Sequence, residues 1–116
     1  MKSVTIPSTI TTIGDTAFCG CGILTTIVIP EGVTAIEKET FRGCVSLSDI
    51  TIPGSVKTIG DKAIFGCYAI TELELPAGVE TIGVQAFGNC TGLTSVTLPN
   101  TVRTIGKQAF ASCAAL

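Results

Sequence analysis

Residues 70–92 read ITELELPAGVETIGVQAFGNCTG, and this unit decides the fold because its pattern recurs every 23 residues along the chain. The period is clearest at the proline, which occurs once in each unit and nowhere else: Pro7, Pro30, Pro53, Pro76 and Pro99. Five of the six cysteines keep the same spacing, at Cys21, Cys44, Cys67, Cys90 and Cys113. A fixed period of this length predicts a solenoid, in which each unit forms one coil and stacks on the next.

Apolar residues alternate just before the proline of each unit. In the unit quoted above, Leu73 and Leu75 stand three residues and one residue before Pro76. Alternation with a period of two predicts a strand with one buried face. Because proline cannot donate a hydrogen bond to a neighbouring strand, we expect it to mark the end of the strand in every coil.

The second half of the unit predicts a different local structure. Val79 and Ile82 follow the proline and predict a second extended or turning segment. Ala86-Phe87, with Cys90 three residues further on, fits a short helical turn. A glycine follows the second apolar position in four units, where we expect it to supply a turn conformation that a side chain would strain: Gly14, Gly60, Gly83 and Gly106.

These patterns predict one domain over residues 1–116: a right-handed solenoid of five 23-residue coils, with a parallel strand ladder and short turns or 3-10 or helical turns. The sequence shows no polar cap at either end, and Leu116 is the first position of a further unit. We therefore interpret the chain as a fragment of a longer array. The isolated fragment is expected to associate end to end or by strand swapping.

Composition excludes several classes of function. The formal net charge is -2 and no basic cluster is present, which argues against nucleic-acid binding. No apolar run approaches the ~18 residues of a membrane-spanning helix, and the N-terminus has no signal-peptide pattern. The absence of histidine excludes Ser-His-Asp and Cys-His catalysis within this chain. We expect neither an enzyme nor a cofactor.

The recurring cysteines are interpreted as a structural ladder of free, buried thiols that pack as small apolar groups. Three disulfides are the alternative, but side chains in register point in parallel and seldom reach disulfide geometry. A spacing of 22 residues between cysteines lacks the close pairs of a zinc site. Cys19 lies outside the ladder, at a position that varies between units, and is predicted to be exposed and the only readily alkylated thiol.

Outward positions of the predicted strands form rows across the coils and are the candidate binding surface. Together they place hydroxyl groups beside a patch of three carboxylates: Thr26, Asp49, Thr51, Glu72, Glu74, Ser95 and Thr97. Such a face suits contact with a protein or glycan through hydrogen bonds. Its carboxylates leave calcium binding open, although no metal site is assigned. Solvated strand-forming residues without a ligand are the other interpretation.

The assembled pattern L-x-x-I-x-I-P, followed by V-x-x-I-G-x-x-A-F-x-x-C, closely resembles the BspA-like leucine-rich repeats, also described from treponemal proteins. The resemblance covers essentially the whole chain. Three positions depart from it: Glu37 replaces glycine, Thr40 replaces alanine, and Ile64-Phe65 places the phenylalanine one residue later.

This resemblance implies a cell-surface or secreted protein of bacteria or parasitic protists, with relatives that act as adhesins toward host matrix and plasma proteins. It transfers no catalytic or ligand residue. We therefore expect a non-catalytic protein-interaction module that recognises a host matrix protein or glycan, without insertion into a membrane. The alternative is a structural spacer or an intracellular, cytoplasmic scaffold.

Overall fold

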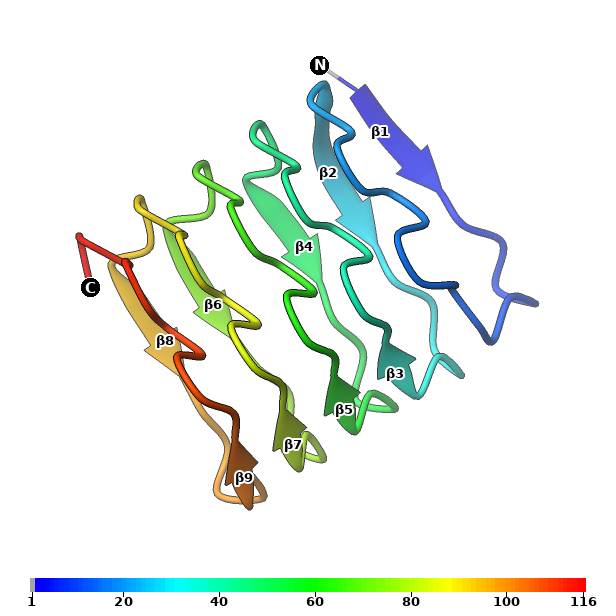
Figure 1. Cartoon of the computed structure of the whole chain (residues 1–116). Helices are drawn as coiled ribbons and strands as arrows, with labels where there is room; N and C mark the ends of the chain where they lie inside the picture. Colours follow the sequence, from blue (N-terminus) through cyan, green and yellow to red (C-terminus); the bar gives the residue numbers. More distant parts are fainter. Residues whose placement is uncertain (1) are drawn as a thin grey trace.

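The computed structural model describes residues 2–116 and shows a solenoid with two ladders of parallel strands (Figure 1). The first residue, which the sequence places in the first strand, lies outside the described residues. The longer strands precede the prolines: β1 (Lys2–Thr5), β2 (Leu24–Val28), β4 (Asp49–Thr51), β6 (Glu72–Glu74) and β8 (Ser95–Thr97). The shorter strands follow them: β3 (Ala35–Ile36), β5 (Thr58–Ile59), β7 (Thr81–Ile82) and β9 (Thr104–Ile105).

The five longer strands are joined by four closed turns, so the expectation of five complete coils was one too many. Closing a fifth turn requires the strand of a further unit, of which the chain contains only Leu116. The 23-residue spacing itself is confirmed by the strand register. Ile27 lies beside Ile50, and Ile59 beside Ile82.

The core is a column of the repeated apolar residues, stacked from coil to coil. In the central coils, Val56 and Val79 after the prolines are fully buried, as are Ile59 and Ile82 of the second ladder. Because every coil contributes the same positions, each coil buries its apolar side against its two neighbours. The prolines follow the longer strands, as expected, and the Pro53 carbonyl accepts a hydrogen bond from the Val56 amide at 3.2 Å.

We call the eight residues that begin at the glycine position of the repeat and end at the cysteine the turn segment of each coil. In the quoted unit the turn segment is 83–90. It contains consecutive turns and no helix among residues 2–116, so of the alternatives that the sequence left open, short turns are confirmed and a helical turn does not form. The reason is a left-handed residue two places after the glycine position, with φ between 54° and 59°: Thr16, Glu39, Lys62, Gln85 and Gln108. A second left-handed residue lies one place before the cysteine of each segment, at Gly20, Gly43, Gly66, Asn89 and Ser112. Together the two interrupt helical geometry.

The turn segments form their own hydrogen-bonded ladder between coils. The amide at the phenylalanine position donates to the carbonyl at the alanine position of the following coil in each of four junctions. Three of these bonds are Phe41 to Ala63, Ile64 to Ala86 and Phe87 to Ala109, each at 2.8 Å. The turn side of the solenoid is therefore bonded continuously from the first coil to the last.

The glycines at the start of the turn segments serve close packing and not a left-handed conformation. Gly60, Gly83 and Gly106 have no positive φ, which corrects the expectation from the sequence. A Cβ atom on Gly83 would lie 2.6 Å from the Asp61 amide nitrogen of the preceding coil. A Cβ on Gly14, in the first coil, would have no neighbour within 4 Å.

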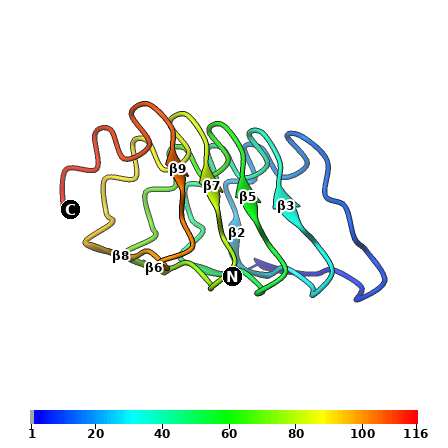
Figure 2. The same ribbon diagram turned by 90° about the horizontal axis from the view of Figure 1, so that it is seen from below.

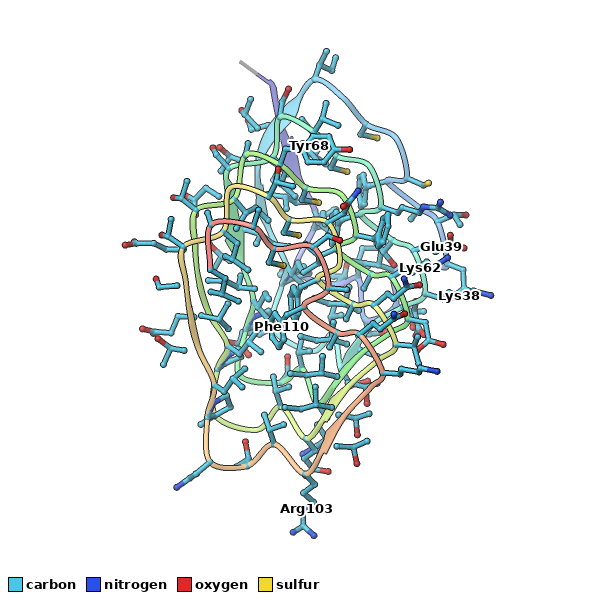
Figure 3. The ribbon with its side chains drawn as sticks, turned by 60° about the vertical axis from the view of Figure 1, so that its left-hand side comes forward. Lys38, Glu39, Lys62, Tyr68, Arg103 and Phe110 are labelled. Carbon is cyan, nitrogen blue, oxygen red and sulfur yellow. The ribbon has the colours of Figure 1, made fainter. Side chains whose placement is uncertain are left out.

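Two departures from the repeat pattern are accommodated by local contacts. Thr40 is fully buried, and its hydroxyl donates to the Glu37 carbonyl at 2.9 Å. Ile64 fills the core position of the phenylalanine, and Phe65 turns outward. There the Arg42 guanidinium lies 5.5 Å and the Lys62 ammonium 5.8 Å from the Phe65 ring centroid. Figure 3 shows Lys62 on the outer side of the coil.

Candidate interaction surface

The candidate binding residues lie on the outer face of the longer strands, in two rows. In the first row, Thr26 of β2 pairs with Asp49 of β4, and Glu72 of β6 pairs with Ser95 of β8. In the second row, Thr51 lies on β4, and Glu74 of β6 pairs with Thr97 of β8. The structure thus places all seven residues on one face.

Both rows are interrupted in the middle, because β4 and β6 do not pair with one another. The first ladder therefore consists of β1-β2-β4 and, separately, β6-β8. In Figure 1 the ribbons of β4 and β6 stand visibly further apart than those of their neighbours on either side. The second ladder, β3-β5-β7-β9, continues without a break past the same place (Figure 2).

The backbone hydrogen bonds at the ends of the longer strands show where the first ladder is interrupted. The Ile29 amide donates to the Thr51 carbonyl at 3.0 Å, and the Leu75 amide to the Thr97 carbonyl at 3.1 Å. The equivalent bond from the Ile52 amide to the Glu74 carbonyl does not form within residues 2–116.

The inward residue of β4 and the one just after the strand are more exposed than their equivalents in the preceding coil. Ile27 and Ile29 are 1% and 2% exposed, whereas Ile50 and Ile52 at the same positions of the next coil are only half-buried.

Between β4 and β6 the interruption forms an open groove of about 540 Å³, which we call the β4–β6 groove. It is lined by six of the seven candidate residues, together with three apolar side chains: Asp49, Thr51, Glu72, Glu74, Ser95, Thr97, Ile50, Ile52 and Leu73. The seventh candidate residue, Thr26, lies on the same face of the solenoid but outside this groove. It borders a second groove of about 510 Å³ between β1 and β2.

The charges on the strands explain why the ladder parts at this junction. Pairing of β4 with β6 in the register of the other coils would set the Asp49 carboxylate beside that of Glu72. Strands in a ladder are about 4.8 Å apart, and like charges directly opposite one another destabilise a sheet. In water two unit charges at such a distance repel by about 1 kcal/mol. At the paired junctions of this ladder one partner or both are uncharged, as where Thr26 meets Asp49 and Glu72 meets Ser95.

Across the described residues, no group of three or more histidine, cysteine, aspartate or glutamate side chains is arranged to hold a metal ion. The groove therefore presents separate carboxylates, hydroxyls and unpaired strand edges.

The recurring cysteines lie inside the coils and are free thiols. Cys44, Cys67 and Cys90 are buried, whereas Cys21 and Cys113, in the terminal coils, are partly accessible. In the interior of Figure 3 the yellow sulfur atoms follow one another from coil to coil. The Cys67 thiol donates to the Phe41 carbonyl of the preceding coil at 3.2 Å, and the other thiols from Cys44 onward repeat this contact.

Burial changes the acidity of these thiols. Desolvation raises the pKa of Cys44 and of Cys90 to about 11, and it raises the pKa of Cys67 further because that thiol lies in the middle of the stack. Cys19 is exposed. The ladder thiols have the environment of packing groups, and the surface thiol is the accessible one.

Sequence reasoning missed the groove itself and the half-buried Ile50 and Ile52 that line it. Their positions in the repeat are those of core residues. The available signal was the pair of carboxylates at the same position of successive units, Asp49 and Glu72, which no other pair of neighbouring coils has in that row.

Parallel ladders with a 23-residue period define a leucine-rich repeat solenoid. The whole chain, residues 1–116, matches the BspA type leucine rich repeat region, in six copies. The chain therefore belongs to the BspA-type leucine-rich repeat family, as the resemblance of its sequence indicated. Proteins of this family are generally non-catalytic. No curated protein sequence matches the chain.

Solved structures show the same fold. A leucine-rich repeat protein from Bacteroides ovatus is 32% identical with a TM-score of 0.83, over 99% of this chain and 36% of that protein. The pneumococcal vaccine antigen PcpA is 23% identical with a TM-score of 0.83, over 96% of this chain and 28% of PcpA. A leucine-rich cell surface protein from Faecalibacterium prausnitzii is 32% identical with a TM-score of 0.65, over 83% of this chain and 32% of that protein.

The chain thus spans about a third of the length of each of these three proteins. Among the described residues, no helix has the length and apolar character needed to cross a membrane. The family and its similar structures indicate a protein-interaction repeat module.

Proposed function

We propose that the chain is a non-catalytic segment of a cell-surface adhesin-like protein, and that it recognises its partner with the β4–β6 groove and the strand face around it. The observation that carries this proposal is the groove, which gathers Asp49, Glu72 and Glu74 with three hydroxyl residues on one open surface. The cell-surface location is supported by the similarity to the Faecalibacterium prausnitzii protein, which is a leucine-rich cell surface protein.

The surface chemistry favours a protein or glycan partner, such as a component of the host matrix. The carboxylates accept hydrogen bonds and the hydroxyls both donate and accept them. The exposed Val28, at 56% accessibility on the same face, adds an apolar contact beyond the groove. Mixed polar and apolar surfaces of this kind are typical of non-obligate interfaces.

A binding screen of the chain against matrix proteins and glycans tests the proposal. Glu72→Lys with Glu74→Lys should abolish or strongly weaken any binding that the screen detects. The matched control is Asp15→Lys with Glu80→Lys, which makes the same change of net charge at exposed carboxylates that line neither groove. Equal binding by the groove variant and the unchanged chain would place the contact elsewhere.

A structural spacer, or an intracellular scaffold in the cytoplasm, is the second candidate. The observation in its favour is the unbroken bonding of the second ladder and the turn segments, which gives a regular stack independent of any ligand. The longer protein's sequence distinguishes the two functions, because a signal peptide and a surface anchor belong to the adhesin and not to the scaffold.

We further propose that residues 1–116 are part of a longer array and that the chain in isolation associates through its two ends. Apolar side chains are exposed at both: Val4 and Ile10 in the first coil, and Leu98, Ile105 and Leu116 in the last.

A further inference from the structure

We propose that the β4–β6 groove accepts an extended basic peptide segment of the partner, which inserts as an additional strand between β4 and β6. This inference rests on the proposed function of the same surface and names the chemistry that it recognises. It is carried by three features of the groove: unpaired strand edges, facing carboxylates, and apolar side chains left half-buried at its floor.

The backbone of the groove provides two complementary edges. At the neighbouring junctions the Ser48 amide donates to the Thr25 carbonyl at 3.0 Å, and the Thr94 amide to the Thr71 carbonyl at 2.7 Å. Across the groove, the repeat-equivalent bond from Thr71 to Ser48 does not form within residues 2–116.

At the other end of the strands, the Ile52 amide and the Glu74 carbonyl are likewise unbonded to each other. An open edge of amides and carbonyls is a template for an added strand. A strand between β4 and β6 would bond to both edges and restore the ladder.

The carboxylates select the charge of the inserted strand. Its outward side chains would lie next to Asp49 on β4 and Glu72 on β6, at the place where two acidic residues currently oppose one another. A lysine or arginine there faces a carboxylate on each side, so that insertion converts a like-charge junction into alternating charges. The next outward side chain would lie between Thr51 and Glu74 and also meets a carboxylate.

The apolar floor of the groove determines which side chain is favoured between the two outward basic residues of the inserted strand. An inward side chain would lie between Ile50 and Leu73, both of which line the groove. An apolar residue would cover Ile50, which the interrupted ladder leaves half-buried. The preferred segment therefore has the pattern basic, apolar, basic. The groove volume of about 540 Å³ lies within the ~300–1,000 Å³ range of ligand sites.

The probe is a capped, fluorescein-labelled peptide of sequence Lys-Val-Lys-Val-Lys, titrated with the whole chain and followed by fluorescence anisotropy. We expect saturable binding that weakens about tenfold or more when both valines are N-methylated, because N-methylation removes strand-pairing donors and keeps the charge. The capped peptide Glu-Val-Glu-Val-Glu should not bind.

Amide hydrogen exchange of the chain supplies the structural readout. In the free protein the Ile52 and Thr71 amides should exchange faster than the bonded amides of Ile29 and Leu75. Saturation with the basic peptide should slow the exchange of Ile52 and Thr71. Glu72→Lys with Glu74→Lys should lose peptide binding, and Asp15→Lys with Glu80→Lys should keep it. Circular dichroism should confirm that both variants fold.

Equal affinity of the N-methylated peptide, or unchanged exchange at Ile52 and Thr71, would overturn strand insertion. Loss of matrix-protein binding in the groove variant would still support the proposed function in that case. If the peptide inserts but no matrix protein or glycan depends on the groove, the proposed function fails and the peptide specificity of the groove stands.

Discussion

At the scale of single residues, each ladder cysteine from Cys44 onward connects two coils through its sulfur atom. The sulfur packs in the core, and the thiol donates a hydrogen bond to a carbonyl oxygen of the preceding coil. One example is the bond from the Cys90 thiol to the Ile64 carbonyl at 3.1 Å. A thiol suits this place because it is a small apolar group with a weak donor, and the buried carbonyl gains a partner at little desolvation cost. No buried side-chain nitrogen or oxygen among the described residues lacks a hydrogen-bond partner.

Native alkylation should label Cys19 first. It is exposed, whereas at pH 8 a thiol with a pKa of about 11, such as Cys44 or Cys90, is ionised at roughly one part in a thousand. Iodoacetamide treatment followed by peptide mass spectrometry should find one rapidly modified site, which Cys19→Ser removes. In urea all six cysteines should react. Rapid labelling of all six cysteines in the native protein would show that the recurring cysteines are not buried.

Alkaline pH should destabilise the fold. The folded-state pKa of Cys44 and Cys90 is raised from 9.0 to about 11, so in the unfolded chain these thiols ionise first. Their contribution is fully present below pH 9 and is lost as the pH rises from about 9 to about 11. Urea unfolding at pH 8, 9.5 and 10.5 should show a falling free energy of unfolding. Replacing both cysteines by alanine lowers stability at pH 8 but should flatten this dependence.

At the scale of elements, the sequence predicted what depends on side-chain period and missed what depends on backbone geometry or on one particular junction. Alternation before the prolines located the longer strands and their register. A helical turn was one of the alternatives expected for the turn segments, because one of their two left-handed positions holds Glu39, Lys62 and Gln85, residues that carry no signal for positive φ. The other left-handed position holds glycine in three coils, and that signal favoured the short turns that form. The apolar pattern is the same at every junction and therefore did not predict the β4–β6 groove, whose signal in the sequence was the pair of neighbouring carboxylates, Asp49 and Glu72.

The close contact at Gly83 gives a test of coil packing. Gly83→Ala should lower the free energy of unfolding by about 1–3 kcal/mol, since its Cβ would meet backbone atoms of Asp61 and Gly60. Gly14→Ala is the matched control at the equivalent position without close neighbours. It should leave stability unchanged or raise it by up to about 1 kcal/mol. Equal effects of the two substitutions in urea unfolding would contradict the packing role.

At the scale of the whole molecule, the solenoid is bonded differently on its two sides. The second ladder and the turn segments bond neighbouring coils past the middle of the stack, and the first ladder does not. A repeat array has only nearest-neighbour interfaces, so one weakened interface lowers the cooperativity of the entire stack. The part of the stack that contains β1, β2 and β4 and the part that contains β6 and β8 are therefore the natural units of partial unfolding.

The isolated chain should associate at high concentration. Leu98, Ile105 and Leu116 are 39%, 50% and 55% exposed in the last coil, and the open strand edges of the terminal coils lie beside them. Light scattering should show a mass that grows with concentration. Leu98→Lys with Ile105→Lys should return the chain to a monomer, whereas Thr51→Lys with Thr97→Lys, on the strand face, should not. A monomer at all concentrations would exclude this association.

The interrupted ladder also has a mechanical consequence. A stack of coils that is bonded on one side and interrupted on the other bends most easily at the interruption, with the intact side as the hinge. In this molecule the intact side is the bonding between β5 and β7 together with the turn segments. Tension on the strand face would widen the β4–β6 groove, and compression would narrow it. The groove is thus the place where load on the array changes the shape of its surface.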